Sequence, residues 1–173
     1  MVSGVEERAR GFFAGRMTLI LGTAGKDSKP TASYAPFVPQ FDLGRLRLYV
    51  YTSTLSQHTS DMVDSRKASA LLLEDEQEAK NLFARKRITF SCDARHVVSQ
   101  TYEWLYMMDR FRGRFGVDFD PIRALGDFVL FRLEPTEAVY VEGFGQAYRM
   151  NGDLYNPVHI MGTGPGAKAH EPA

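Results

Sequence analysis

The side chains best suited to chemistry in this chain are its four histidines, because imidazole both moves protons near neutral pH and binds metal ions. They are His58, His96, His159 and His170. No paired carboxylates, Ser-His-Asp set or Cys-His pair accompanies them, so the sequence carries no motif of nucleophilic catalysis. His58 lies near the start of a predicted helix, His96 ends a predicted strand and His170 lies in a glycine-rich tail.

Two sets of donors could hold an anionic ligand. The predicted helix 53–65 offers free backbone N–H groups at its start, where Thr54 and Gln57 match a capping box. Three hydroxyls lie in the same turn, those of Ser53, Ser56 and Thr59. The second set is the basic triplet Arg85, Lys86 and Arg87. Such a triplet is usually a solvated strand end, but this one follows an apolar strand and a polar crossing, so we predict that it anchors the ligand.

The stretch 68–98 is the centre of the predicted fold. Residues 70–73 are all apolar, residues 74–80 are mostly charged, and residues 86–98 alternate between apolar and polar side chains. Alternation with period two is typical of a half-buried strand, whereas an unbroken apolar run is typical of a strand buried on both faces. We therefore predict two strands joined by a polar connection, as in the wall of a β-barrel.

Similar patterns place the other elements. Strands are predicted over 17–23, 31–40, 45–52, 128–133 and 138–150, and helices over 2–16, 53–65 and 99–115. Pro36 and Pro39 interrupt one strand, which we expect at a sheet edge, bulged or bent, because proline donates no hydrogen bond. The order predicts the α+β class, an antiparallel split β-barrel with flanking helices. Several strands lack a clean polar face, so we expect a homodimer that covers part of the outer surface.

Composition limits the function classes. The 173 residues suit one domain, or one domain with a tail. With 21 basic and 21 acidic side chains the net charge is zero, which argues against a nucleic-acid partner. The single cysteine, Cys92, excludes a disulfide framework and is interpreted as a core residue. No run approaches the roughly 20 apolar residues of a membrane helix, and no secretory signal is present, so we expect a cytoplasmic protein without a membrane partner.

The last residues differ in character from the rest. We predict a barrel domain over residues 1–150 and a C-terminal tail over residues 151–173. Three glycines surround Pro165 in this tail, which is typical of loop structure. A glycine-rich backbone can fold over a bound ligand, so we expect the tail to close the ligand site.

Several segments resemble one family. The resemblance is carried by ASYAPFV (32–38), LSQHT (55–59), LEDEQEAKNLFARKRITF (73–90), DFVLFRL (127–133) and GFGQAY (143–148). They are similar to haem-utilisation proteins of the HutZ/HugZ type, within the pyridoxamine 5′-phosphate oxidase-like FMN-binding split-barrel superfamily. The likeness covers about residues 17–148, and the run 73–90 is its most specific part.

This resemblance implies a homodimer that binds haem at its interface and degrades it oxidatively for iron acquisition, with an unknown electron donor. It implies an iron ligand in the C-terminal tail, for which His170 is the first candidate and His159 the second. It also implies that Asp127 lies beside that ligand, where a carboxylate would make the imidazole more electron-rich; an ordinary aspartate before a strand is the equal alternative. His58 is a candidate to line the site.

Two alternatives remain open. In the first, the protein is a haem carrier without turnover. In the second, it is an FMN-binding oxidoreductase of the same superfamily. FMN-dependent oxidases of this superfamily tend to carry a basic pair just after the helix-start serine, where this chain has Gln57 and His58. That difference argues against tight FMN binding. Haem propionates and the FMN phosphate both need donors, and the hydroxyls and basic triplet above are the candidates for either ligand.

Overall fold

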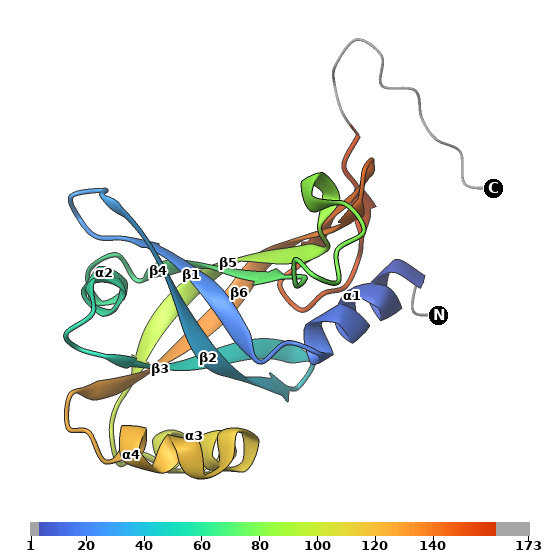
Figure 1. Ribbon diagram of the computed structural model, residues 1–173. Coiled ribbons are helices and arrows are strands. Elements are labelled where there is room, and N and C mark those ends of the chain that lie inside the picture. The colour runs from blue at the N-terminus through green and yellow to red at the C-terminus, as the bar shows by residue number, and fades with distance from the viewer. Residues whose placement is uncertain (1–3, 162–173) are drawn as a thin grey trace.

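A closed six-stranded antiparallel barrel forms the body of the protein (Figure 1). The computed structural model describes residues 4–161. The barrel strands are β1 (Thr18–Ala24), β2 (Pro30–Asp42), β3 (Arg45–Ser53), β4 (Lys67–Leu73), β5 (Arg87–Val97) and β6 (Phe128–Gly143). They pair in the order β3-β2-β1-β4-β5-β6, and an additional β3–β6 pairing closes the ring. The predicted α+β class and antiparallel barrel are confirmed.

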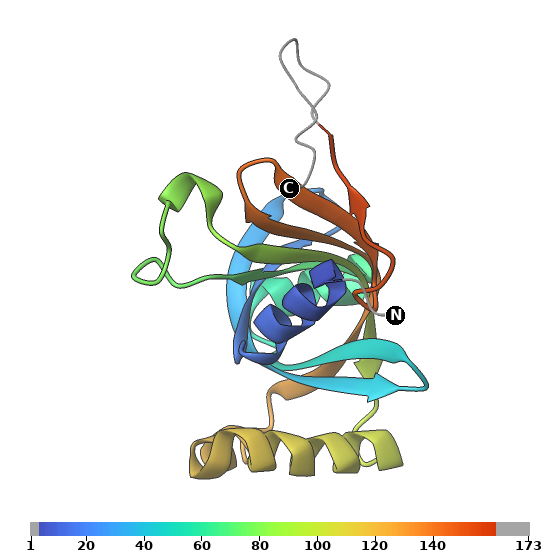
Figure 2. The ribbon, with the colours of Figure 1, turned by 90° about the vertical axis from the view of Figure 1, so that its right-hand side faces the viewer.

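The barrel interior is filled from its strands and plugged at both ends by helices. Alternate residues such as Leu48, Phe90 and Leu133 point inward and are fully buried. The helix α1 (Gly4–Ala14) lies across one mouth, as Figure 2 shows, and inserts Phe13, whose ring centroid is 6.0 Å from that of Phe90. The helix α2 (Gln57–Ser65) covers the other end with the fully buried Met62.

A second apolar cluster lies outside the barrel. It joins the outer side of β3 to the helices α3 (Tyr102–Phe115) and α4 (Phe119–Arg123), which lie below the barrel in Figure 1. Two single-turn 3₁₀ segments, η1 (Leu82–Ala84) and η2 (Gly116–Asp118), complete the helical structure of the described residues. Tyr49 fixes the start of α3, because its hydroxyl donates to Glu103 over 2.8 Å.

The prolines of β2 lie on either side of the point where the strand changes its neighbour. Residues 30–36 pair with β1, whereas residues 37–42 pair with β3. The strand therefore changes its partner between Pro36 and Phe37. Each half of β2 has one neighbour in the described sheet, so a missing N–H can face the unpaired side. The expected edge position is the alternative that best describes each half of this strand.

The two strands predicted over 128–133 and 138–150 are divided differently. Residues 128–143 form one strand, β6, and β7 (Gln146–Asn151) and β8 (Val158–His159) follow it. Glu134 and Pro135 do not end β6, because a register shift opposite Ser91 and Cys92 accommodates the proline. Gly143 ends β6, and the β6–β7 turn follows it, where Gly145 has a φ of 69°.

Residues just after 150 pack on the barrel. Leu154 is fully buried in the barrel cluster, and Asp153 Oδ1 accepts a hydrogen bond of 2.7 Å from the Leu46 N–H. A Cβ on Gly152 would lie 2.0 Å from the Pro135 carbonyl oxygen, so glycine is required there. The packed structure therefore extends beyond the predicted boundary at residue 150. Residues 162–173 of the predicted tail 151–173 lie outside the described residues, and closure of the tail over a ligand stays a prediction.

None of the described helices has the length and apolar character needed to span a bilayer.

Candidate functional site

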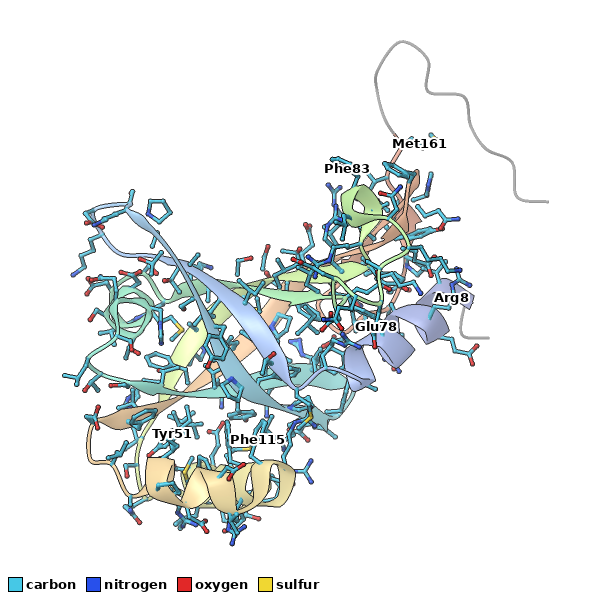
Figure 3. The ribbon with its side chains drawn as sticks, viewed as in Figure 1. Arg8, Tyr51, Glu78, Phe83, Phe115 and Met161 are labelled. Carbon is cyan, nitrogen blue, oxygen red and sulfur yellow. The ribbon has the colours of Figure 1, made fainter. Side chains whose placement is uncertain are left out.

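An aromatic cavity lies between the barrel and the helices α3 and α4. Its volume is about 400 Å³, and its walls are largely rings and aliphatic groups from β2, β3, α3, α4 and the start of β6. The rings are those of Tyr34, Tyr51, Phe111, Phe115, Phe119 and Phe128. Figure 3 shows Tyr51 and Phe115 in this layer, between the barrel and α3. Such a cavity suits a flat, conjugated ligand.

Ring packing makes one wall of this cavity rigid. The Tyr51 ring lies 5.7 Å from Phe119 and 5.4 Å from Phe128, measured between centroids. Phe111 stacks on Phe119 at 5.3 Å, with an interplanar angle of 24°. Burial raises the pKa of the Tyr51 hydroxyl, so this group stays neutral at physiological pH.

The polar edge of the cavity comes from the end of β3 and the start of α2. Ser53, Ser56 and His58 line it there. Ser56 is the N-cap residue of α2, yet its hydroxyl makes no capping hydrogen bond and is available to a ligand. The predicted Thr54–Gln57 capping box is wrong, since the helix begins later and the Gln57 amide donates to Asp61 over 2.8 Å.

Asp127 lies beside this edge. The Ser53 hydroxyl donates to Asp127 Oδ2 over 2.7 Å, and the Thr54 N–H donates to the Asp127 carbonyl over 2.6 Å. Asp127 therefore joins the end of β3 to the start of β6. Its neighbours Ser53 and Phe128 both line the cavity, so the carboxylate is close to the site.

Thr59 and His58 differ in whether a ligand in the cavity could contact them. Thr59 is buried, and its hydroxyl donates to the Ser53 carbonyl over 2.7 Å, so it supports the loop beneath the site. His58 is half-buried and faces the cavity. Desolvation lowers the pKa of His58, against the opposing effect of the Asp61 carboxylate.

The basic triplet lies at the opposite end of the barrel. Arg85 donates to the Glu74 carbonyl over 3.1 Å and pairs with Glu76 at 3.3 Å, and the Lys86 N–H donates to Glu74. Arg87 opens β5 opposite Leu73, and the β4–β5 pairing runs seven residues from there to Lys67, just after α2. This distance is about 20 Å at the usual rise per residue. One protomer therefore does not bring the triplet to the start of α2.

The other two histidines of the described residues, His96 and His159, lie away from the cavity. His159 is exposed on β8, with Nε2 2.7 Å from the Gly145 carbonyl oxygen and its ring 5.4 Å from that of Tyr148. Phe83 in η1 and Met161 after β8 mark this end of the molecule in Figure 3. His96 is exposed and packs on Phe131. His170 lies outside the described residues.

Within residues 4–161 no group of three His, Cys, Asp or Glu side chains could hold a metal ion.

Sequence reasoning missed the aromatic wall. Phe111, Phe115 and Phe119 follow one another at intervals of four residues, a spacing that also describes the buried face of any helix. The signal was visible, but the sequence did not say that α3 and α4 would leave space against Tyr34 and Tyr51. Only the packing of the helices on the barrel separates cavity wall from core.

A family model described as pyridoxamine 5′-phosphate oxidase matches residues 5–142 of the chain. The chain belongs to this family. Among curated members it is 38% identical, over 157 residues, to the Heme oxygenase HutZ of Vibrio cholerae serotype O1. The match covers 90% of this chain and 87% of HutZ, which confirms the resemblance inferred from the sequence motifs.

Solved structures agree with this assignment. The crystal structure of HutZ, described as the heme storage protein from Vibrio cholerae, matches with a TM-score of 0.73 at 33% identity, over 83% of this chain and 97% of that one. Campylobacter jejuni ChuZ matches with a TM-score of 0.81 at 27% identity, over 100% of this chain and 68% of ChuZ. This pyridoxamine 5′-phosphate oxidase family member thus shares both sequence and fold with HutZ.

Proposed function

We propose that this protein binds haem and degrades it oxidatively, releasing iron. The observation that carries the proposal is an aromatic cavity with a polar edge, in a chain 38% identical to the Heme oxygenase HutZ over 90% of its length. The haem would carry out the oxygen chemistry, with O₂ as the oxidant and electrons from an external donor. The protein would bind the macrocycle, orient it and control the polarity around it.

The residues of the cavity fit such a ligand. The rings around Tyr51 and Phe119 suit the face of an apolar, planar macrocycle, whereas the propionates need donors at its rim. The Ser56 hydroxyl and the N–H groups that open α2 are placed to donate there. Ser53 and Thr59 hold this edge, through Asp127 and the Ser53 carbonyl respectively.

For the iron ligand we propose His170, with His159 as the second candidate. An axial imidazole is commonly oriented by an acceptor for its other N–H, and Asp127 beside the cavity is the carboxylate we assign to that role. His58 would then face the ligand from α2. His159 is held by Gly145 at the far end of its own protomer, so it would reach a cavity only in a partner subunit.

We propose that two copies of the chain pair through the outer face of the sheet. A row of uncharged side chains crosses five strands there in register, from Tyr34 through Ile20, Leu71 and Thr89 to Val139. Tyr34 is 70% exposed, and a groove of about 720 Å³ lies over Tyr34, Ile20 and Leu71. The uncharged row favours burial against a second protomer, while residues 74–78, mostly acidic, and Arg85 line another part of the groove.

Such a dimer would also account for the basic triplet. With a two-fold axis across the middle of the row, the Val139 end of one protomer lies over the Tyr34 end of the other. Tyr34 borders the cavity, and Arg87 pairs with Val141, two residues after Val139 on β6. The partner's Arg87, with Arg85 and Lys86, would then approach the propionates of a haem bound in the facing cavity.

Haem storage is the second candidate function, favoured because the crystal structure of HutZ is described as that of a heme storage protein. FMN binding is supported only by the family name, and Gln57 and His58 stand where a basic pair would clamp its phosphate. A cytoplasmic location and the need for an electron donor remain predictions.

A hemin titration tests the proposal. We expect a sharp Soret band that saturates at about one haem per protomer and is lost in His170→Ala. With ascorbate and catalase present, the Soret band should then disappear and iron should be released. A stable Soret band under these conditions would establish storage. A yellow protein whose flavin spectrum does not change when hemin is added would contradict both haem functions.

The dimer has a separate test. Leu71→Arg places a charge at the centre of the uncharged row, and we expect it to halve the mass measured by light scattering. Ser60→Arg, which adds the same charge at an exposed position on α2, is the control and should leave the mass unchanged. A wild-type protein that is monomeric at micromolar concentration would contradict the proposed pairing.

A further inference from the structure

Asp61 is a buried carboxylate that the site described above does not use. It lies on the second turn of α2 and is 2% exposed. Buried carboxylates are usually paired with a cation, because removing a charge from water is costly. Here the three side chains that donate hydrogen bonds to it are neutral, namely those of Gln57, Thr23 and Thr31.

These donors come from two different parts of the fold. Gln57 is the first residue of α2, and its amide nitrogen is 2.8 Å from Asp61 Oδ1. Thr23 is on β1, and its hydroxyl donates to Asp61 Oδ2 over 2.8 Å. The β1–β2 turn covers the carboxylate, since a Cβ built on Gly25 would lie 3.0 Å from Oδ1. Asp61 therefore ties the first turn of α2 to the β1–β2 hairpin, which lies beside α2 in Figure 1.

The segment held in this way is the polar edge of the cavity. Ser56 immediately precedes Gln57, and His58 follows it, one helical turn before Asp61. Both Ser56 and His58 line the cavity. The hydrogen bond from Gln57, with those from Thr23 and Thr31, holds the pKa of Asp61 below its ordinary value. The carboxylate thus stays ionised as an acceptor at physiological pH.

Building on the haem binding proposed above, we propose that Asp61 is a positioning residue of the ligand cavity. Its carboxylate fixes the first turn of α2 against the β1–β2 hairpin, and so places the Ser56 hydroxyl and the His58 ring at the cavity edge. Asp61 acts through these two residues and does not touch the ligand.

The first test compares Asp61→Asn with Asp64→Asn. Asparagine keeps the size of the side chain but removes its negative charge and replaces one acceptor oxygen with a donor NH2 group. We expect the hemin dissociation constant to rise about tenfold, the scale of a lost hydrogen bond to a charged group. Asp64 is on the same helix, 3.9 Å from Lys26 and partly exposed, so Asp64→Asn should leave the constant unchanged. An unchanged constant in a folded Asp61→Asn protein would overturn the proposal.

Exchanging the partners provides a rescue. In the double variant Asp61→Asn with Gln57→Glu, the new amide donates to the new carboxylate, so the same tie is rebuilt with its roles reversed. We expect this variant to recover most of the hemin affinity lost in Asp61→Asn. Thr23→Val removes the donor on the hairpin and should weaken hemin binding in the same direction. Failure of the exchange to restore any affinity would contradict a positioning role.

A double-mutant cycle that combines Asp61→Asn with His58→Ala shows whether Asp61 acts through the His58 ring. If it does, His58→Ala should cost less hemin affinity in the Asp61→Asn background than in the wild type, since the ring is already displaced. Equal costs in the two backgrounds would overturn the proposed route.

A measurement without hemin separates this inference from the function it rests on. We expect the imidazole NMR signals of His58 in the ligand-free protein to shift in Asp61→Asn and to remain in place in Asp64→Asn. If wild-type protein fails to bind hemin, the proposed function is wrong, while these signals still decide whether Asp61 positions His58. If hemin binds and the His58 signals stay in place, only the positioning role is wrong.

Discussion

The two apolar clusters of this protein differ in how completely they fill their space. Inside the barrel, side chains such as Leu48, Phe90 and Leu133 meet from all sides and are fully buried. Under α3, rings such as Tyr51 and Phe119 pack closely but leave a cavity of about 400 Å³ at their edge. A straight helix can follow a curved barrel only over part of its length. The interior therefore supplies stability, and the helix contact supplies both stability and a site.

The largest effect is expected from truncation inside the barrel. Phe90→Ala removes a fully buried ring that contacts Phe13 of α1, and should lower the free energy of unfolding by about 3–5 kcal/mol. Urea unfolding measures this change. The protein that remains folded should bind hemin as the wild type does, because the cavity is on the other side of the sheet. A weaker hemin affinity in fully folded Phe90→Ala would show that the clusters are not independent.

Truncation of a side chain in the cavity wall should cost less stability and more hemin affinity than truncation inside the barrel. Phe128 is half-buried at the start of β6, and Phe128→Ala should cost only about 1–2 kcal/mol of stability. Its loss removes a ring from the cavity, so we expect the hemin dissociation constant to rise about tenfold. Phe41→Ala is the matched control, since Phe41 is half-exposed and packs on Phe13 instead. Equal hemin affinity in both variants would count against this cavity as the haem site.

Loss of the tie at the start of α3 should have a smaller effect. Tyr49→Phe removes the hydrogen bond to Glu103, which keeps its partner Arg132 at 2.7 Å. Burial raises the pKa of Tyr49 to about 12, so the hydroxyl is a neutral donor at physiological pH. We expect a loss of about 1 kcal/mol in urea unfolding. Trp104, the single tryptophan and the next residue on α3, should report a shifted emission maximum if the helix moves.

The smallest effect is a dependence on pH near the cavity edge. Since desolvation lowers the pKa of His58 below 6.5, the unfolded chain binds a proton more readily than the folded protein does. Stability should therefore fall as the pH drops through this range, and melting temperatures at about pH 7 and about pH 5.5 measure the change. His58→Gln should show a shallower dependence. Greater stability at the lower pH would mean that His58 gains a partner on protonation.

Local patterns predicted most of the barrel correctly because a strand with one buried face must alternate. The residues of β5 between Arg87 and Val97 alternate clearly, and the structure confirms that strand. Prediction failed where pairing overrides local preference. Pro135 reads as the end of a strand, but the register shift opposite Ser91 lets β6 continue past it. Likewise Thr54 and Gln57 match a capping box, whereas α2 begins only at Gln57, after the N-cap residue Ser56.

The sequence by itself determined the family, the barrel and the identity of the polar residues at the head of α2, because each depends on neighbours along the chain. Only the tertiary structure decided which of these residues share a site. It brought Asp127 to Ser53, enclosed the aromatic cavity between β3 and α3, and placed Asp61 under the β1–β2 turn. It also placed the basic triplet at the far end of the same barrel. Such distances depend on strand register and helix packing, which join segments far apart in the sequence.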